Sequence, residues 1–138
     1  MVKLGKTIPA GDLFELDAAS SIPVWLQLKN RFIYLITSGF YLPGDQLPTV
    51  RGLAAEVEVN YNTVSKVYVN LESDGYVESV RGRGVFVRDI GGKADDVRSI
   101  ADTEIEGCIR RCLALGMTID EVTLRMMDVT HRLKDEKP

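Results

Sequence analysis

The amino-acid sequence predicts a mainly α-helical protein with a small β-hairpin: a winged helix-turn-helix domain followed by a two-helix dimerisation tail. Two short helical patterns, at residues 49–57 and 60–75, are separated by only 58-EVN-60, and so brief a connection is typical of a helix-turn-helix. The segments 76-YVESV-80 and 85-VFVRD-89 are rich in β-branched and aromatic residues and flank a glycine-containing turn, which predicts the hairpin. Farther along, apolar residues recur at three- and four-residue steps, which predicts the two helices of the tail.

The composition limits the class of protein. The chain has 138 residues, enough for one domain with an appendage, and its 45% hydrophobic and 27% charged residues are typical of soluble globular proteins. No apolar run approaches the length that crosses a bilayer, and residues 1–17 lack the apolar centre of a signal peptide. We therefore expect a cytoplasmic protein without membrane association.

Four segments are predicted along the chain. Residues 1–20 show little periodicity and are interpreted as an N-terminal arm. Residues 21–89 hold the winged helix-turn-helix domain, which we expect to bind DNA, and residues 90–96 form a linker. Residues 97–138 form a helical dimerisation region.

The predicted domain contains three helices. The first lies within residues 21–40 and ends near a glycine. Thr49 is the expected N-cap of the second helix, and Asn60 is the expected N-cap of the third. One apolar stripe of the first helix is formed by Trp25, Leu28, Phe32, Leu35 and Ile36.

The third helix carries most of the residues expected to contact DNA, because the second helix of a helix-turn-helix enters the major groove. Asn62 is expected to pair with adenine, and Ser65 with a polar base edge. Thr63 and Lys66 would hold phosphates, which fix register without reading sequence. Tyr61 would touch a phosphate through its hydroxyl or a thymine methyl through its ring. An ordinary polar surface helix is the alternative for this pattern.

Arginines outside that helix complete the predicted interface. Arg51 lies in the first turn of its helix, where a cation is poorly placed for the helix dipole, so a phosphate or a guanine edge is its expected partner. Gly82 and Gly84 permit a slim hairpin tip, from which Arg81 and Arg83 would project into a minor groove. The predicted DNA-binding residues are Thr49, Arg51, Asn60, Tyr61, Asn62, Thr63, Ser65, Lys66, Arg81, Gly82 and Arg83.

Several spaced motifs resemble one family. The segments 47-LPTVRGLA-54 and 60-NYNTVSKVYVNLESDGYVESVRGRGVFV-87, with the lead-in 14-FELDAASSIPVWLQL-28, resemble the winged-helix DNA-binding domain of GntR-type bacterial transcription regulators. Most subfamilies of that family carry a large effector-binding domain next, whereas this chain has only 48 residues after Ile90. That length resembles the small YtrA subfamily, whose short helical tail serves chiefly to form dimers.

The resemblance also assigns roles to single residues. It implies that Arg51, Asn62, Thr63 and the wing glycine Gly82 lie at the DNA, and that Thr49 caps the second helix near a phosphate. Two positions depart from the family pattern. Ser65 stands where an arginine is frequent, so its contact is expected to be weaker or replaced by Lys66. Glu58 stands where a glycine is frequent, which predicts either strain in the turn or a slightly different turn.

The two predicted tail helices have an apolar face that the tail itself is too small to cover. Thr118 and Glu121 form a capping box that opens the second tail helix. A helical hairpin of this size is expected to bury its apolar face against a second copy, which predicts a homodimer. The residues expected at this interface are Val97, Ala101, Ile105, Cys108, Cys112, Leu115, Val122, Met126 and Val129.

Other functions are weighed against the leading hypothesis of a homodimeric repressor that binds a short palindromic operator. Residues 22–90 carry seven basic and seven acidic side chains, and this neutrality favours a protein-interaction module. Cys108 and Cys112 share one helix face, with His131 in the next helix, which would suit a thiol- or metal-responsive sensor that binds DNA. Both cysteines fall on the apolar stripe, so we expect buried structural residues and no metal site.

No catalytic group is evident. The chain has one histidine and no nucleophile with a paired base, so we expect neither an enzyme nor a cofactor. The sequence offers no large pocket, and it leaves open an unknown small-molecule effector bound at the dimer interface or between the domain and the tail.

Overall fold

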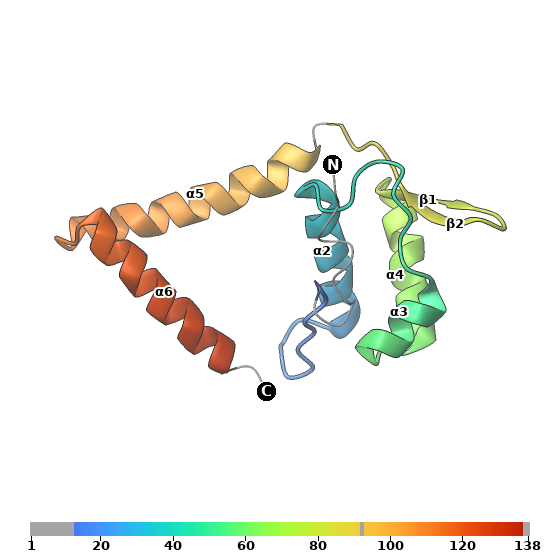
Figure 1. The fold of residues 1–138 in the computed structure, drawn as a ribbon, viewed down its shortest axis with the longest axis horizontal. Helices are drawn as coiled ribbons and strands as arrows, with labels where there is room; N and C mark the ends of the chain where they lie inside the picture. The colour runs from blue at the N-terminus through green and yellow to red at the C-terminus, as the bar shows by residue number, and fades with distance from the viewer. Residues whose placement is uncertain (1–12, 92, 137–138) are drawn as a thin grey trace. The chain divides into compact units, whose positions relative to one another are not determined.

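The structure is a computed structural model that describes residues 13–91 and 93–136, apart from the side chains of residues 93–97. The chain forms two compact units: the first ends at Val97, and the second begins at Arg98. The predicted fold class, mainly α-helical with a β-hairpin, is confirmed (Figure 1). In chain order the elements are α2 (Val24–Thr37), α3 (Val50–Val57), α4 (Tyr61–Ser73), β1 (Val77–Val80), β2 (Gly84–Val87), α5 (Lys93–Ala114) and α6 (Ile119–Asp135).

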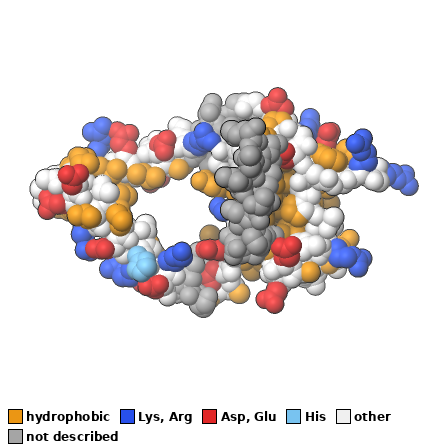
Figure 2. Space-filling view, viewed as in Figure 1, with side chains coloured by type: hydrophobic (Ala, Val, Ile, Leu, Met, Phe, Trp, Pro, Cys, Tyr) orange, Lys and Arg blue, Asp and Glu red, His pale blue; other side chains and the backbone are white. Residues whose placement is uncertain are grey.

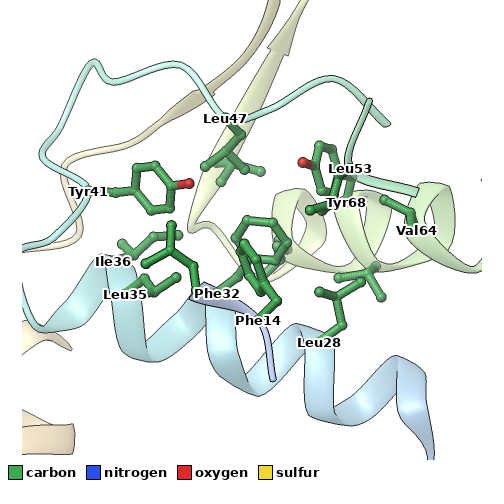
Figure 3. Packing of buried hydrophobic residues seen from close by; sticks show 14 of the residues in the cluster. Phe14, Leu28, Phe32, Leu35, Ile36, Tyr41, Leu47, Leu53, Val64 and Tyr68 are labelled. Atoms are coloured by element: carbon green, nitrogen blue, oxygen red, sulfur yellow. The ribbon is translucent and has the colours of Figure 1, made fainter. Parts of the chain in front are cut away.

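The core of the first unit lies between α2 and α4, which pack against each other. Phe32 on α2 is fully buried, and its ring lies 5.4 Å from the ring of Tyr68 in an edge-on arrangement (Figure 3). The Phe14 ring lies 4.7 Å from that of Phe32, so Leu13 and Phe14, which were predicted in the N-terminal arm, belong to the core. The remaining core residues are Leu28, Leu35, Ile36, Tyr41, Leu47, Leu53, Ala54, Val64, Val67, Leu71, Val77 and Val87.

The stripe predicted for α2 is correct except at its start. Leu28, Phe32, Leu35 and Ile36 are buried, but the side chain of Trp25 is 43% exposed. Periodicity alone places Trp25 on the stripe because it precedes Leu28 by three residues. The side chain lies in the first turn of α2, and there the core ends.

The two helices of the helix-turn-helix begin at the predicted caps. The Thr49 hydroxyl accepts a hydrogen bond from the Gly52 N–H at 3.0 Å, and the Asn60 side-chain oxygen accepts one from the Asn62 N–H at 2.8 Å. Glu58 ends α3 in the left-handed conformation, with φ 55° and ψ 43°. This backbone suits glycine, so the predicted strain in the turn is located at Glu58.

The hairpin pairs with a further segment of the chain that the sequence does not predict. β1 and β2 pair antiparallel, with Val77 opposite Val87 and Val80 opposite Gly84. Residues 44–47 run along the other edge of β2, where the Leu47 N–H donates to the Val85 carbonyl at 2.9 Å. We call residues 77–87 the wing and residues 81–83 the wing tip.

Tyr68 ties α4 to the segment before α3. Its hydroxyl donates to the Pro48 carbonyl at 2.6 Å. Burial, with a smaller contribution from Tyr41, raises the pKa of Tyr68 well above the ordinary tyrosine value. The hydroxyl therefore remains a neutral donor, and it holds the start of α3 against α4.

The second unit consists of most of α5 followed by α6. Helix α5 begins at Lys93, four residues before the predicted helix start at Val97. The predicted capping box of α6 is confirmed, because the Glu121 N–H donates to the Thr118 hydroxyl at 3.2 Å and the Thr118 N–H donates to the Glu121 carboxylate at 3.0 Å. These bonds lower the pKa of Glu121. Over the described ranges, no helix is long and apolar enough to span a membrane.

Candidate nucleic-acid interface

Helix α4 turns one face to the core and the opposite face to solvent. Val64, Val67, Tyr68 and Leu71 are buried, so helical geometry directs the opposite side outward. The residues predicted to contact DNA lie on that outward side or at its borders. Tyr61, Asn62 and Lys66 are exposed, Thr63 and Ser65 are partly buried, and Asn60 is exposed at the N-cap.

One groove collects predicted residues from three parts of the chain. Its volume is about 290 Å³, and we call it the Arg51 groove. It brings Thr49 and Arg51 at the start of α3 together with Tyr61 at the start of α4 and Gly84 of the wing. The N–H groups of two helix N-termini lie near this groove, an arrangement that favours an anionic ligand such as phosphate. The groove is lined by Gln46, Leu47, Pro48, Thr49, Val50, Arg51, Tyr61, Tyr68, Gly84 and Val85.

The wing tip is a tight turn closed by a hydrogen bond from the Arg83 N–H to the Val80 carbonyl at 2.9 Å. Gly82 and Gly84 both have positive φ, at 77° and 127°, which favours glycine at both positions. Arg81, Gly82 and Arg83 are all exposed. Figure 2 shows basic side chains at the end of the unit where Figure 1 places the wing.

The cations of this surface are free to meet a new partner. Within residues 13–91, Arg51, Lys66, Arg81 and Arg83 form no ion pair with a carboxylate within 4.0 Å. An unpaired arginine or lysine loses no existing salt bridge when it contacts a phosphate. The surface thus gathers positive charge locally in a segment that is neutral as a whole.

Gln46, which was not among the predicted site residues, supports the wing tip. The Gln46 side chain donates to the Arg83 carbonyl at 3.0 Å. A Cβ atom added at Gly84 would lie 2.5 Å from the Gln46 side-chain nitrogen, so the two residues fit closely. This contact joins positions 37 residues apart, and no local motif of the sequence signals it.

The residues predicted at the dimer interface differ in exposure. Ala101, Ile105 and Leu115 are exposed, and Leu115 reaches 81%. Cys108, Cys112, Met126 and Val129 are partly buried, whereas Val122 is already buried within the single chain. The side chain of Val97 lies outside the described residues. Both cysteines are free, and no group of three or more potential metal ligands occurs in the described part of the chain.

Comparison with known proteins identifies the helix-turn-helix segment. A model of the family "Bacterial regulatory proteins, gntR family" matches residues 26–87. The uncharacterized HTH-type transcriptional regulator YhcF of Bacillus subtilis (strain 168) is 35% identical over 104 residues, which cover 75% of this chain and 86% of YhcF. The HTH-type transcriptional repressor YtrA of the same strain is 41% identical over 75 residues, which cover 54% of this chain and 58% of YtrA.

A solved structure extends the similarity into the tail. YtrA from Sulfolobus acidocaldarius, a GntR-family transcription factor, matches with a TM-score of 0.52 and 29% identity. The match covers 87% of this chain and 98% of that protein. These findings confirm the resemblance drawn from the sequence and favour DNA binding over the protein-interaction module. The chain is a DNA-binding transcription regulator, and it belongs to the GntR family as a YtrA-like member.

Proposed function

We propose that the protein is a homodimeric repressor that binds a two-fold-symmetric operator in the cytoplasm and blocks transcription there. The observation that supports this most is the exposed surface formed by α4, the Arg51 groove and the wing tip. Its free cations and helix N-termini are suited to a DNA backbone. The YtrA repressor of Bacillus subtilis, 41% identical over 75 residues, supports repression as the outcome.

In this proposal α4 lies in the major groove. Asn62 and Ser65 present polar groups to base edges from the exposed side of the helix. Thr63 and Lys66 hold phosphates, while Arg51 reaches a phosphate or a guanine edge from the start of α3. Asn62 and Ser65, which are proposed to contact the bases, have short side chains. The phosphate contacts around α4 must therefore fix the position of this helix in the groove.

The wing is assigned to the flanking minor groove. Arg81 and Arg83 project from a turn that is only three residues long, and Gln46 holds this turn at its Arg83 carbonyl. A narrow minor groove concentrates negative potential, which attracts arginine. Because the backbone of the turn is already fixed, it loses little conformational entropy on binding.

The second unit is proposed to form the dimer. Ile105 on α5 is 47% exposed, and Leu115, which directly follows α5, is 81% exposed. The partly buried Cys108 and Cys112 lie on the same stripe of α5 as Ile105. An exposed apolar stripe of this kind favours association with an identical stripe. The proposed activity is binding without a catalytic step.

Selection of bound duplexes from a random DNA pool at physiological salt tests the proposal. We expect enrichment of one motif with two-fold symmetry and half-sites about 10–10.5 base pairs, or a multiple of this spacing, apart. A reporter gene with that motif over its promoter should be silenced when the protein is expressed. A folded protein that enriches no motif, or one that activates the reporter, contradicts the proposal.

A further inference from the structure

Gln46 connects the start of the helix-turn-helix to the wing tip. It directly precedes residues 47–49, which lead into α3, and its side-chain N–H₂ donates to the Arg83 carbonyl at 3.0 Å. Gln46 and Gly84 both line the Arg51 groove. One side chain therefore links the segment that carries Arg51 to the tip that carries Arg83.

Other contacts hold the base of the wing but do not extend to its tip. Residues 44–47 pair with the other edge of β2 (Figure 1), and the Glu72 carboxylate on α4 accepts a hydrogen bond from the Ser79 N–H at 2.7 Å. Within residues 13–91, Gln46 is the one side chain outside the wing that forms a hydrogen bond with residues 81–83. The base of the wing thus stays in place without Gln46, and loss of the Gln46 bond frees the tip alone.

The contact between Gln46 and the wing is close. A Cβ atom added at Gly84 would lie 2.5 Å from the Gln46 side-chain nitrogen and 3.3 Å from its Cδ atom. A Cβ atom added at Gly82 would meet nothing within 4 Å. The tip is therefore held at Arg83, next to Gly84, and is open at Gly82, where a DNA groove can receive it.

The bond from Gln46 fixes the direction in which Arg83 leaves the tip. The carbonyl that Gln46 holds and the arginine side chain belong to the same residue, so a rotation of this residue's backbone also moves its side chain. DNA that covers the tip excludes water, and a hydrogen bond shielded from water is stronger than an exposed one. We therefore expect the Gln46 bond to contribute more in the complex than in the free protein.

Minor grooves vary with DNA sequence, and an inserted arginine detects this variation. A·T-rich tracts have a narrow minor groove whose negative potential attracts arginine. An arginine held at a fixed distance from α3 and α4 meets that groove at fixed base pairs, whereas a mobile arginine averages over several. The residue that fixes the tip therefore decides how sharply the flanking base pairs are selected.

We propose that Gln46 is a positioning residue that fixes Arg83 in the minor groove and thereby sets the base-pair preference flanking each half-site. This proposal rests on the proposed function, to which it adds the residue that controls flanking specificity. Gln46 acts through Arg83 and does not bind DNA itself. Its effect must therefore depend on the arginines of the wing tip.

Selection from a random DNA pool, carried out in parallel with the unaltered protein and with Gln46→Met, tests the proposal. Methionine has nearly the same length as glutamine but no N–H to donate. We expect Gln46→Met to select the same half-sites and to lose the A·T preference in their flanks. Fluorescence anisotropy with the duplex that the unaltered protein selects should show roughly threefold to tenfold weaker binding, the contribution of one neutral hydrogen bond.

A double-mutant cycle separates positioning from direct contact. Arg81→Ala combined with Arg83→Ala removes the groups through which Gln46 is proposed to act. In that background Gln46→Met should change the affinity by less than about twofold, because the effects of residues that act through one another are not additive.

Two further variants separate positioning from a loss of stability. Gln27→Met makes the same change at the other glutamine of the chain, whose side chain donates to the Asp17 and Ile22 carbonyls before α2. It removes more hydrogen bonds than Gln46→Met does, but it should keep the flanking preference. Gln46→Ala should lose that preference as Gln46→Met does. Thermal melting checks that each variant is folded.

Each result decides between the alternatives. If Gln46→Met keeps both the flanking preference and full affinity, or if the unaltered protein has no flanking preference, Gln46 does not position the tip, although the proposed function stands. If its loss of affinity persists undiminished without the two arginines, Gln46 contacts DNA itself and the positioning role is wrong. If Gln27→Met loses the preference equally, a general loss of stability is the cause. If the unaltered protein enriches no duplex at all, both proposals fail.

Discussion

At the scale of single residues, Glu58 stands where the family frequently has glycine, and this difference costs free energy of folding. It adopts φ 55° in the turn between α3 and α4, and the described residues contain no other non-glycine with positive φ. A left-handed conformation costs an L-residue roughly 1–2 kcal/mol compared with glycine, which adopts it freely. This turn connects α3 to α4, so the strain lies within the helix-turn-helix itself.

Replacing Glu58 should therefore stabilise the protein. We expect Glu58→Gly to raise the free energy of unfolding by about 0.5–1 kcal/mol, because relief of strain outweighs the greater entropy of glycine in the unfolded chain. Urea denaturation measures the change. Glu58→Gln removes the charge but keeps the strain, and it should leave stability nearly unchanged. An equal gain from both variants would mean that charge, rather than backbone strain, is the cause.

Arg51 carries a prediction about binding. Arg51→Ala should weaken operator binding by about 1–3 kcal/mol if the guanidinium contacts a base edge, and it should relax the sequence preference at that position. Fluorescence anisotropy with the selected duplex and its single-base variants measures both effects. Arg110→Ala, which removes an exposed arginine paired with Glu106 on α5, is the matched control. Unchanged affinity in Arg51→Ala would remove this residue from the interface.

At the scale of secondary-structure elements, Tyr68 joins two parts of the helix-turn-helix. Its hydroxyl bonds the Pro48 carbonyl, and burial raises its pKa. Because the folded protein disfavours the ionised phenol, the stability that the neutral hydroxyl contributes is complete below the ordinary tyrosine pKa, about 10, and is lost as the pH rises above it.

The Tyr68→Phe variant tests that connection. At neutral pH it should lose about 0.5–1.5 kcal/mol of unfolding free energy, with an additional cost from the unpaired Pro48 carbonyl. It should also lose less stability than the unaltered protein between pH 9 and 11. Urea titrations across this range measure the difference. A pH profile identical to that of the unaltered protein would show that Tyr68 does not produce the alkaline sensitivity.

Much of each element was predictable because its signals are local. Thr49, Asn60 and Thr118 were predicted as caps, and each accepts the expected backbone hydrogen bond, since capping involves residues only two or three positions apart. The pairing of residues 44–47 with β2 was missed because it joins distant segments without a turn between them. Trp25 was placed in the core for a related reason: periodicity gives the face of a helix but not where the core ends.

At the scale of the whole molecule, charge and association set how the regulator meets DNA. The net charge is −3, so the overall field does not attract DNA, and the free cations of the first unit must do so locally. A single copy with few phosphate contacts would bind weakly. In the proposed homodimer, the second unit joins two copies, so that engagement of the second half-site would be intramolecular and would raise the affinity without new contacts per copy.

Disrupting the tail should accordingly weaken operator binding. Ile105→Glu places a charge on the exposed apolar stripe of α5, and we expect monomers and at least a tenfold loss of affinity for the symmetric duplex. Analytical ultracentrifugation and anisotropy measure the two effects. Thr103→Glu adds the same charge at an exposed position on the opposite side of α5 and should change neither. Monomers that bind the duplex with full affinity would contradict the role of the tail.

In the proposed complex, two copies place α4 in successive major grooves, with their wings in the flanking minor grooves. Hydroxyl-radical and base-methylation protection of the selected duplex detects both sets of contacts. We expect two protected major-groove patches one helical turn, or a whole number of turns, apart on one face, and flanking minor-groove protection that disappears when Arg81 and Arg83 are both changed to alanine. A single protected patch, or minor-groove protection that survives the double change, would contradict it.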